Sequence, residues 1–229
     1  MTADLDPVET PALAETRRRL VLVGAGGAGR ELLALVRSSP RFLAAHRIDD
    51  VVFVDDAAER PGSPAPVVST IDAYVPDSAD LVLCAIGEPR SRASVVERLD
   101  AVGAAYATFV HDTAVILPGS SIGEGSVVYP FVVVSTDVTV GAHVWLQASA
   151  ALGHDVVVGD GATVSGGAKL LGGVTVGDRV FVATAAVLSP GVEIGASARV
   201  GAGSVVLRRV RPESTVFGVP AVMLPGAAR

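Results

Sequence analysis

The chain has 229 residues, of which 50% are hydrophobic and only 4% aromatic, and its formal net charge is −6. An acidic chain offers no general basic field to nucleic acid or an anionic membrane, and no stretch reaches the ~20 apolar residues that cross a bilayer. The single cysteine, Cys84, excludes a disulfide framework and a cysteine metal site.

The first segment, residues 1–18, is acidic and contains proline, so we expect a flexible tail. It has no apolar core of the kind found in secretory signals. The absence of disulfide chemistry and of a signal together favour a reducing cytoplasm as the location of the protein.

Residues 19–110 are expected to form a compact α/β domain. Its apolar runs predict strands at Leu20–Val23, Val51–Val54 and Leu81–Ile86, helices at Arg30–Ser38 and Ser91–Val102, and a closing strand at Ala104–Val110. Strands that alternate with helices favour a parallel sheet. About ninety residues suffice for only half of a dinucleotide-binding fold, so we expect a small Rossmann-like domain.

A glycine-rich turn, Gly24–Gly29, joins the first predicted strand to the first predicted helix. A strand, a glycine turn and a helix N-terminus together are typical of a phosphate site. Asp55 and Asp56 end the next strand, where a carboxylate can accept hydrogen bonds from a ribose or a base. The pattern predicts a nucleotide site, with a nicotinamide-dependent reductase and a purely structural turn as alternatives. Once the segment that follows is assigned to a repeat, no catalytic dehydrogenase domain remains.

The rest of the chain is a repeat of six residues. From Ile116 to Val206 an aliphatic residue stands at every sixth position, and Ser, Ala or Val stands two residues before each. This period fits neither a helix nor a strand with its turn, and it is typical of a solenoid. We interpret each hexad as one side of a three-sided coil with glycine at the corners, where a positive φ or a tight backbone approach is needed. The expected β-helix covers residues 111–210, and a cap covers residues 211–229.

Hexads of this form resemble the left-handed parallel β-helix of the hexapeptide-repeat acyltransferases. A glycine-rich α/β domain ahead of the helix resembles, within that group, the sialic-acid O-acetyltransferase and nucleotide-amino-sugar N-acetyltransferase family. The matching landmarks are Gly24–Gly29, Phe53–Asp56, Ala85–Gly87 followed by Arg92, Gly153–Asp155 and Gly218–Ala221. The resemblance implies a homotrimer that transfers an acyl group from acyl-CoA to an amine or hydroxyl of a nucleotide-linked sugar. The acyl group expected first is acetyl.

His154 is the leading candidate for a general base. It lies at a predicted corner, two residues after inward-facing Leu152 and two before inward-facing Val156, so its ring is expected to point outward. Asp155 can orient the imidazole, and Gly172, one 18-residue coil later, leaves space above the ring. The resemblance places the family's general base here, and a backbone N–H at Gly172 is the expected oxyanion donor. The alternative is an exposed turn histidine without a role.

A zinc hydratase built on a β-helix is a second enzymatic alternative. Its site needs three imidazoles that converge on one metal ion. His143 and His154 are eleven residues apart, nearly two sides around a coil, and no closely spaced pair of histidines exists. No metal site is therefore expected.

The resemblance also implies which residues contact the two substrates. The acceptor residues are Gly24, Gly26, Gly27, Ala28, Asp55 and Asp56. The acyl-CoA residues, on the outer face of the later coils, are Thr163, Gly172, Ala183, Thr184, Ala202, Gly218, Pro220 and Ala221. Thr163 is nine residues, or half a coil, after His154, so the two are expected on opposite sides of the prism. If both serve one site, that site must lie between subunits.

Three positions near the expected substrates depart from the family pattern. Thr163 stands where a second histidine is common, Ala28 where a larger and often polar residue is common, and Gln147 where Asn is usual. These departures leave open the acceptor, for which an amino acid or a natural-product intermediate is the alternative, and the size of the acyl group. A non-catalytic nucleotide-binding β-helix scaffold is the alternative of another class, and replacement of His154 separates it from an enzyme.

Overall fold

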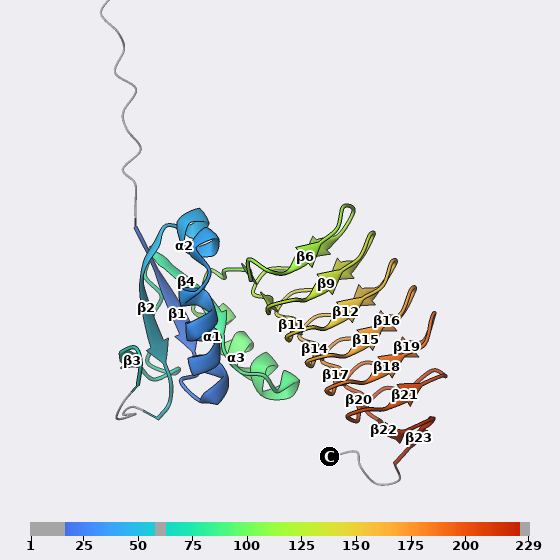
Figure 1. The fold of residues 1–229 in the computed structure, drawn as a ribbon. Coiled ribbons are helices and arrows are strands. Elements are labelled where there is room, and N and C mark those ends of the chain that lie inside the picture. Colours follow the sequence, from blue (N-terminus) through green and yellow to red (C-terminus); the bar gives the residue numbers. More distant parts are fainter. Residues whose placement is uncertain (1–16, 58–62, 225–229) are drawn as a thin grey trace, which may run out of the picture.

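The computed structural model of the protein describes residues 17–57 and 63–224 and has two parts. An α/β unit lies beside a long solenoid, and helix α3 (Pro89–Ala101) lies on the side of the unit that meets the solenoid (Figure 1). Of the tail expected over residues 1–18, only the last two fall within the described residues. No helix in the described ranges has the length and apolar character needed to cross a membrane.

The α/β unit contains a parallel sheet with strand order β3-β2-β1-β4, as the alternating pattern predicted. Its strands are β1 (Arg18–Val23), β2 (Ile48–Val54), β3 (Val67–Ser69) and β4 (Asp80–Cys84), and its other helices are α1 (Gly27–Arg37) and α2 (Pro40–His46). Alternate residues of a strand point to opposite faces. Leu20 and Leu22 accordingly pack in one core cluster with α1, whereas Val21 and Val23 pack in another with α3.

The predicted closing strand at Ala104–Val110 is wrong. In this segment only Tyr106 bridges to the unit's sheet, at Val82. Residues Phe109–Val110 form β5 instead, which pairs with Val127–Val128 (β8) of the solenoid. The Phe109 ring is fully buried and packs edge-on against Phe42 of α2, which the sequence also failed to predict. The backbone of this segment is thus divided between the two sheets, because Ala105 O and Ala107 N bond to Val82 of the α/β sheet whereas Phe109 and Val110 join the solenoid sheet.

The solenoid follows the sixfold pattern closely, and this prediction is confirmed. Each aliphatic residue of the sixfold series from Val128 to Val206 points inward and is at most 2% exposed, and strands pair in parallel with a register of eighteen residues, as in Leu152 with Leu170. After β5 and β8 its strands are β6 (Val115–Ile116), β7 (Ser121–Ile122), β9 (Val133–Val134), β10 (Thr139–Val140), β11 (Trp145–Leu146), β12 (Ala151–Leu152), β13 (Val157–Val158), β14 (Thr163–Val164), β15 (Lys169–Leu170), β16 (Thr175–Val176), β17 (Phe181–Val182), β18 (Val187–Leu188), β19 (Glu193–Ile194), β20 (Arg199–Val200), β21 (Val205–Val206), β22 (Thr215–Gly218) and β23 (Ala221–Met223).

The strands of the coils fall into three faces, numbered in chain order. Face 1 contains β5, β8, β11, β14, β17, β20 and the final hairpin β22–β23; face 2 contains β6, β9, β12, β15, β18 and β21; face 3 contains β7, β10, β13, β16 and β19. The α/β unit covers face 1, where Val127, Trp145 and Thr163 are buried although they point outward. Face 2 is open and mostly apolar, because its outward residues are Val115, Val133, Ala151, Lys169, Val187 and Val205.

The corners use glycine for close approach between coils. At Gly153, which begins a hexad, an added Cβ would lie 2.8 Å from the backbone N of Gly172 in the next coil. The positive φ falls two residues later, at Asp155, with φ 57°. Of the two reasons expected for glycine at hexad starts, the tight approach is therefore the one that applies at Gly153.

A buried carboxylate at the edge of the α/β sheet stabilises this unit. Asp80 accepts hydrogen bonds from Arg19 Nε (2.7 Å) and Nη2 (2.8 Å), from the Tyr74 hydroxyl (2.8 Å) and from Asp77 N (3.0 Å), and its side chain is 1% exposed. Burial alone would raise the pKa of Asp80, but these hydrogen bonds outweigh it and lower the pKa below its usual value.

We expect Asp80→Asn to lower the free energy of unfolding by about 2 kcal/mol at neutral pH, because it weakens a buried charged network. A depressed native pKa stabilises the fold above the unfolded pKa of about 3.9, and this contribution is lost as pH falls. The difference between wild type and variant in urea denaturation should therefore shrink at acidic pH. Asp49→Asn, which breaks the exposed Arg17–Asp49 pair, is the control and should change stability by less than about 0.5 kcal/mol.

Candidate active site

His154 lies at the corner between faces 2 and 3, after β12 and before β13. Its Nδ1 is 2.7 Å from Asp155 Oδ2, and the two side chains are 68% and 67% exposed. A carboxylate at this distance favours the tautomer with the proton on Nδ1. The Nε2 lone pair is then available to accept a proton from a molecule at the surface.

Gly172 lies directly against the imidazole. A Cβ at this position would be 2.6 Å from both Cε1 and Nε2 of His154, so the space expected above the ring is occupied by the ring itself. The next residue, Gly173, donates its N–H to His154 O at 2.9 Å. Within the part of the chain that the structure describes, the Gly172 N–H has no backbone or side-chain acceptor. A proton acceptor and an unused N–H donor thus lie at the same corner.

A second site lies at the carboxyl ends of the α/β strands. A pocket of about 430 Å³ is lined there by all six predicted acceptor residues. Its other lining residues are Ile71, Ala85, Ile86, Gly87 and Glu88. Helix α1 begins at this pocket without a side-chain cap. Its first N–H groups are therefore directed at the pocket, as in sites that bind phosphate.

The aspartates at this pocket also brace its walls. Asp55 accepts hydrogen bonds from Ala25 N (2.6 Å) and Ala57 N (2.8 Å), and Asp56 accepts one from Ile71 N (2.9 Å). A carboxylate oxygen can accept more than one hydrogen bond, so bracing the walls does not exclude contact with hydroxyl or N–H groups of a ligand. The charged side chains lining the pocket, within the described ranges, are the carboxylates of Asp55, Asp56 and Glu88.

Gly29 is required for the shape of this turn. A Cβ at Gly29 would lie 1.8 Å from the carbonyl oxygen of Gly24 and 3.3 Å from the ring of Phe53. The last glycine of the loop therefore allows α1 to pack against the end of β1, which sets the position of the helix N-terminus.

The two sites lie on different sides of the solenoid within one chain. Gly87 and Glu88, in the pocket wall, contact Thr163 and Arg199 on face 1. His154 is at the corner between faces 2 and 3, which is the edge of the prism opposite face 1. The pocket and the imidazole are thus not brought together in a single chain.

The residues expected to contact acyl-CoA fall into separate groups. Thr184 and Ala202 lie one coil apart on the corner between faces 1 and 2, next to Ala183, and Gly203 N donates to Thr184 O at 2.9 Å. The turn Gly218–Ala221 continues the same edge, since Gly218 N donates to Ser204 Oγ at 3.1 Å. Gly172 lies across face 2, beside His154. Face 2 is therefore bordered by His154 on one edge and by most of the expected donor residues on the other.

Comparisons with known proteins agree with this architecture. Residues 19–99 match the family model of the PglD N-terminal domain. WeeI from Acinetobacter baumannii AYE is 30% identical, with 90% of this chain and 100% of that one covered and a TM-score of 0.81. The acetyltransferase domain of PglB from Neisseria gonorrhoeae FA1090, in complex with acetyl coenzyme A, is 27% identical over 91% of this chain and 100% of that one, with a TM-score of 0.80.

A variant of perosamine N-acetyltransferase from Caulobacter crescentus, in complex with CoA and GDP-perosamine, is 28% identical, with 93% and 99% of the two chains covered and a TM-score of 0.79. The chain belongs to this family of hexapeptide-repeat acetyltransferases for nucleotide-linked amino sugars. The fold predicted from the sequence, a Rossmann-like unit followed by a left-handed β-helix, is the fold of the family. No curated protein sequence matches the chain.

Thr163 departs from the role that the family resemblance implied. Its side chain is buried on face 1, where the hydroxyl donates to Gly87 O and accepts from Arg92 Nη2, both at 2.9 Å. A contact between this side chain and an acyl donor on an outer face does not fit this burial, because the α/β unit covers it. The buried Thr163 side chain therefore does not support a site shared between subunits, although Thr163 and His154 do lie on opposite sides of the prism.

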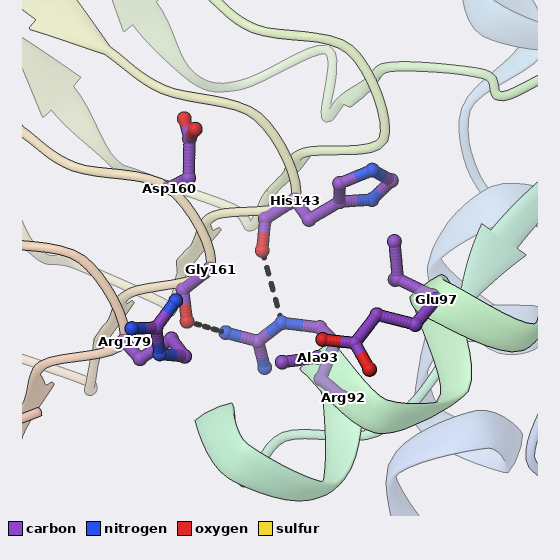
Figure 2. A pocket seen from close by; sticks show the side chains of 8 residues that line it. Arg92, Ala93, Glu97, His143, Asp160, Gly161 and Arg179 are labelled. Carbon is purple, nitrogen blue, oxygen red and sulfur yellow. Dashed lines mark hydrogen bonds between the residues drawn. The ribbon is translucent and has the colours of Figure 1, made fainter. Parts of the chain in front are cut away.

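Arg92 is the residue whose importance the sequence did not reveal, beyond its place among the family landmarks. It is fully buried in α3 and donates to carbonyl oxygens of both parts of the chain, among them His143 O and Gly161 O (Figure 2). Burial lowers its pKa to about 10. The signal in the sequence is its spacing, because Arg92 shares one helical face with Val95, Val96 and Leu99.

His143, near the junction of the two parts, packs edge-on against the Tyr106 ring, with centroids 4.5 Å apart. Burial lowers its pKa. Among the described residues, no three His, Cys, Asp or Glu side chains gather as a metal site would require.

Proposed function

We propose that this protein transfers an acetyl group from acetyl-CoA to the amine of a nucleotide-linked amino sugar, with His154 as general base. The observation that carries the proposal is the exposed His154–Asp155 pair seated against Gly172, with an unused N–H at the same corner. Family membership supports it, since the related structures are bound to acetyl coenzyme A in one case and to CoA with GDP-perosamine in another.

In the proposed reaction the acceptor nitrogen attacks the thioester carbonyl carbon, and Nε2 of His154 takes the proton that the nitrogen loses. Asp155 holds the Nδ1–H tautomer and stabilises the imidazolium that forms. The Gly172 N–H donates to the carbonyl oxygen as it becomes negative. The carbon–sulfur bond then breaks, and the imidazolium returns its proton to the departing CoA thiolate.

The acceptor is proposed to bind in the pocket of the α/β unit. Its diphosphate lies at the N-terminus of α1, along Gly24, Gly26, Gly27 and Ala28, where backbone N–H groups and the helix dipole favour anions. Asp55 and Asp56 accept hydrogen bonds from the ribose or the base. The methyl side chain of Ala28 leaves more room than the larger residue usual in the family.

The donor is proposed to lie along the edge between faces 1 and 2. The residues there are Ala183, Thr184, Ala202, Gly218, Pro220 and Ala221, and most have small side chains that allow a pantetheine chain to approach the backbone. Gly172 contacts the thioester end, beside His154. In this arrangement the donor and the base lie on opposite edges of face 2. They come together if face 2 is an interface between copies of the chain.

We therefore propose a homotrimer with active sites between subunits. Face 2 presents exposed Val115 (46%) and Val133 (42%), whereas face 3 presents mainly polar residues such as Thr139 and Glu193. Contact through face 2 buries the apolar row and brings the His154 edge of one protomer to the donor edge of another. It also lets an acceptor held over face 1 of one chain reach a base on a different chain. The reaction is proposed to take place in the cytoplasm, where acetyl-CoA is available.

The interface is tested by mass measurement. We expect the wild type to have three times the chain mass of 23.2 kDa by light scattering, and Val133→Arg on face 2 to shift the protein toward monomer, because the interface would bury an unpaired charge. Val157→Arg on face 3 is the control, since Val157 has the same 42% exposure and the same place in a two-residue strand. A trimer that survives Val133→Arg and dissociates with Val157→Arg would place the interface on face 3.

The reaction is tested with the purified chain, acetyl-CoA and a panel of amino sugars linked to UDP, GDP or dTDP. Release of free CoA thiol and an acetylated product in mass spectrometry are expected with at least one member. Analogues with a hydroxyl in place of the amine, free amino acids and longer acyl-CoAs test the other acceptors and donors. Nucleotide binding without thiol release across the panel would instead support a non-catalytic scaffold.

A further inference from the structure

Arg92 connects the α/β unit to the solenoid through a buried set of hydrogen bonds. Its guanidinium donates to Ile86 O (2.7 Å) in its own unit and, in the solenoid, to His143 O (2.9 Å), Gly161 O (2.7 Å), Ala162 O (3.0 Å) and Thr163 Oγ1 (2.9 Å). Figure 2 shows the side chain reaching from α3 to the corner segments that hold His143 and Gly161.

Thr163 completes the connection in the opposite direction. While it accepts from Arg92, its hydroxyl donates to Gly87 O at 2.9 Å. The carbonyl groups of Ile86 and Gly87 are thus both tied to one solenoid coil. The ring of Trp145 supports the same segment, since a Cβ at Gly87 would lie 3.9 Å from it. Glu88 adds an ion pair to Arg199 at 3.1 Å.

The Ile86–Glu88 segment is also one wall of the acceptor pocket. The hydrogen bonds that attach the two parts of the chain therefore end on the pocket itself rather than at a distant surface. All the acceptors that Arg92 uses are neutral, so no single carboxylate fixes its position. Its placement depends instead on the directions of several carbonyl groups, and such a contact is sensitive to small displacements.

We infer that Arg92 and Thr163, the junction pair, are positioning residues for the acceptor. They fix the Ile86–Glu88 wall against the solenoid and so set where the acceptor amine lies relative to the acyl group. The inference rests on the proposed function, since it takes the pocket to be the acceptor site. In a trimer held by its solenoids, the same attachment determines how the pocket of one chain faces His154 of another.

Thr163→Val tests the inference with little change in volume, because the substitution replaces the hydroxyl with a methyl group. We expect the KM for the acceptor to rise about tenfold and kcat to fall about tenfold, since small misplacements of reacting groups are costly. The KM for acetyl-CoA should stay within about twofold, because the proposed donor edge does not include Thr163. Thr163→Ser keeps the hydroxyl and should restore both values to within about threefold.

Thr139→Val is the matched control. Thr139 has the same place in a two-residue strand, but it is exposed on face 3, and the valine variant should behave as wild type. Arg92→Lys keeps the charge without the planar set of donors and is expected to affect the acceptor more strongly than Thr163→Val. Because Arg92 is fully buried and its replacement also perturbs folding, the inference is judged on Thr163.

Unchanged acceptor KM and kcat in Thr163→Val would overturn the inference. So would a lower kcat with both KM values unchanged and a matching loss of folded protein, since this is the behaviour of a merely structural contact. If the wild type transfers no acetyl group, the proposed function fails separately. The junction pair is then judged by calorimetric binding of the nucleotide sugars, which Thr163→Val should weaken about tenfold if the pair positions the pocket wall.

Discussion

Replacing His154 with alanine is expected to lower kcat by about 10²–10⁴-fold while both substrates still bind, which is the usual loss when a general base is removed. The side chain is 68% exposed, so the fold should remain intact. Steady-state kinetics with acetyl-CoA and the amino-sugar nucleotide found by the panel measure the loss. Calorimetry with each substrate measures the binding that should remain.

Asp155 is expected to contribute less than His154, with a fall in kcat of about 10–100-fold in Asp155→Asn, because the imidazole loses only its orienting carboxylate. Asparagine is the right replacement, since Asp155 has φ 57° and asparagine tolerates this conformation better than alanine. Asp137→Asn is the control, because Asp137 occupies the same corner one coil earlier with φ 58°.

If His154→Ala retains kcat within about threefold of the wild-type value, His154 is excluded as the general base.

The sixfold period predicted the solenoid and also the outward position of His154. The reason is that an inward residue at every sixth place fixes the direction of every side chain between, and the corner follows from Leu152 and Val156 on either side. The same period does not indicate which outward face the α/β unit covers. Val127 on covered face 1 and Val133 on open face 2 are both outward valines, and only the position of the α/β unit distinguishes them.

This limit explains the misplacement of Thr163. Its place on the side of the prism opposite His154 was correctly predicted, but its burial depends on a contact with Gly87, seventy-six residues earlier in the chain. The short elements were missed for a different reason. Strand β3 has three residues and α2 has seven, too few to show a hydrophobic period, and Phe109 was assigned to the wrong sheet because an apolar pair fits either one.

Gly172→Ala should reduce kcat by about 10²-fold through the position of the imidazole alone. The added methyl carbon would lie 2.6 Å from Cε1 and Nε2 of His154, a separation that van der Waals contact does not allow. The backbone at Gly172 has no positive φ, and the ring is free to rotate toward solvent, so the melting temperature should change little. The displaced ring then loses its place between Asp155 and the Gly172 N–H.

A double-mutant cycle distinguishes this account from a general effect of the methyl group on donor binding. If the methyl acts by moving the ring, Gly172→Ala should add almost nothing in a His154→Ala background, because the group that it displaces is already absent. If the methyl instead blocks the thioester, the two losses should multiply and the KM for acetyl-CoA should rise in both backgrounds. Alanine retains the backbone N–H, so the proposed oxyanion donor stays in place throughout the cycle and the measured loss reports on Gly172 as a support for the base.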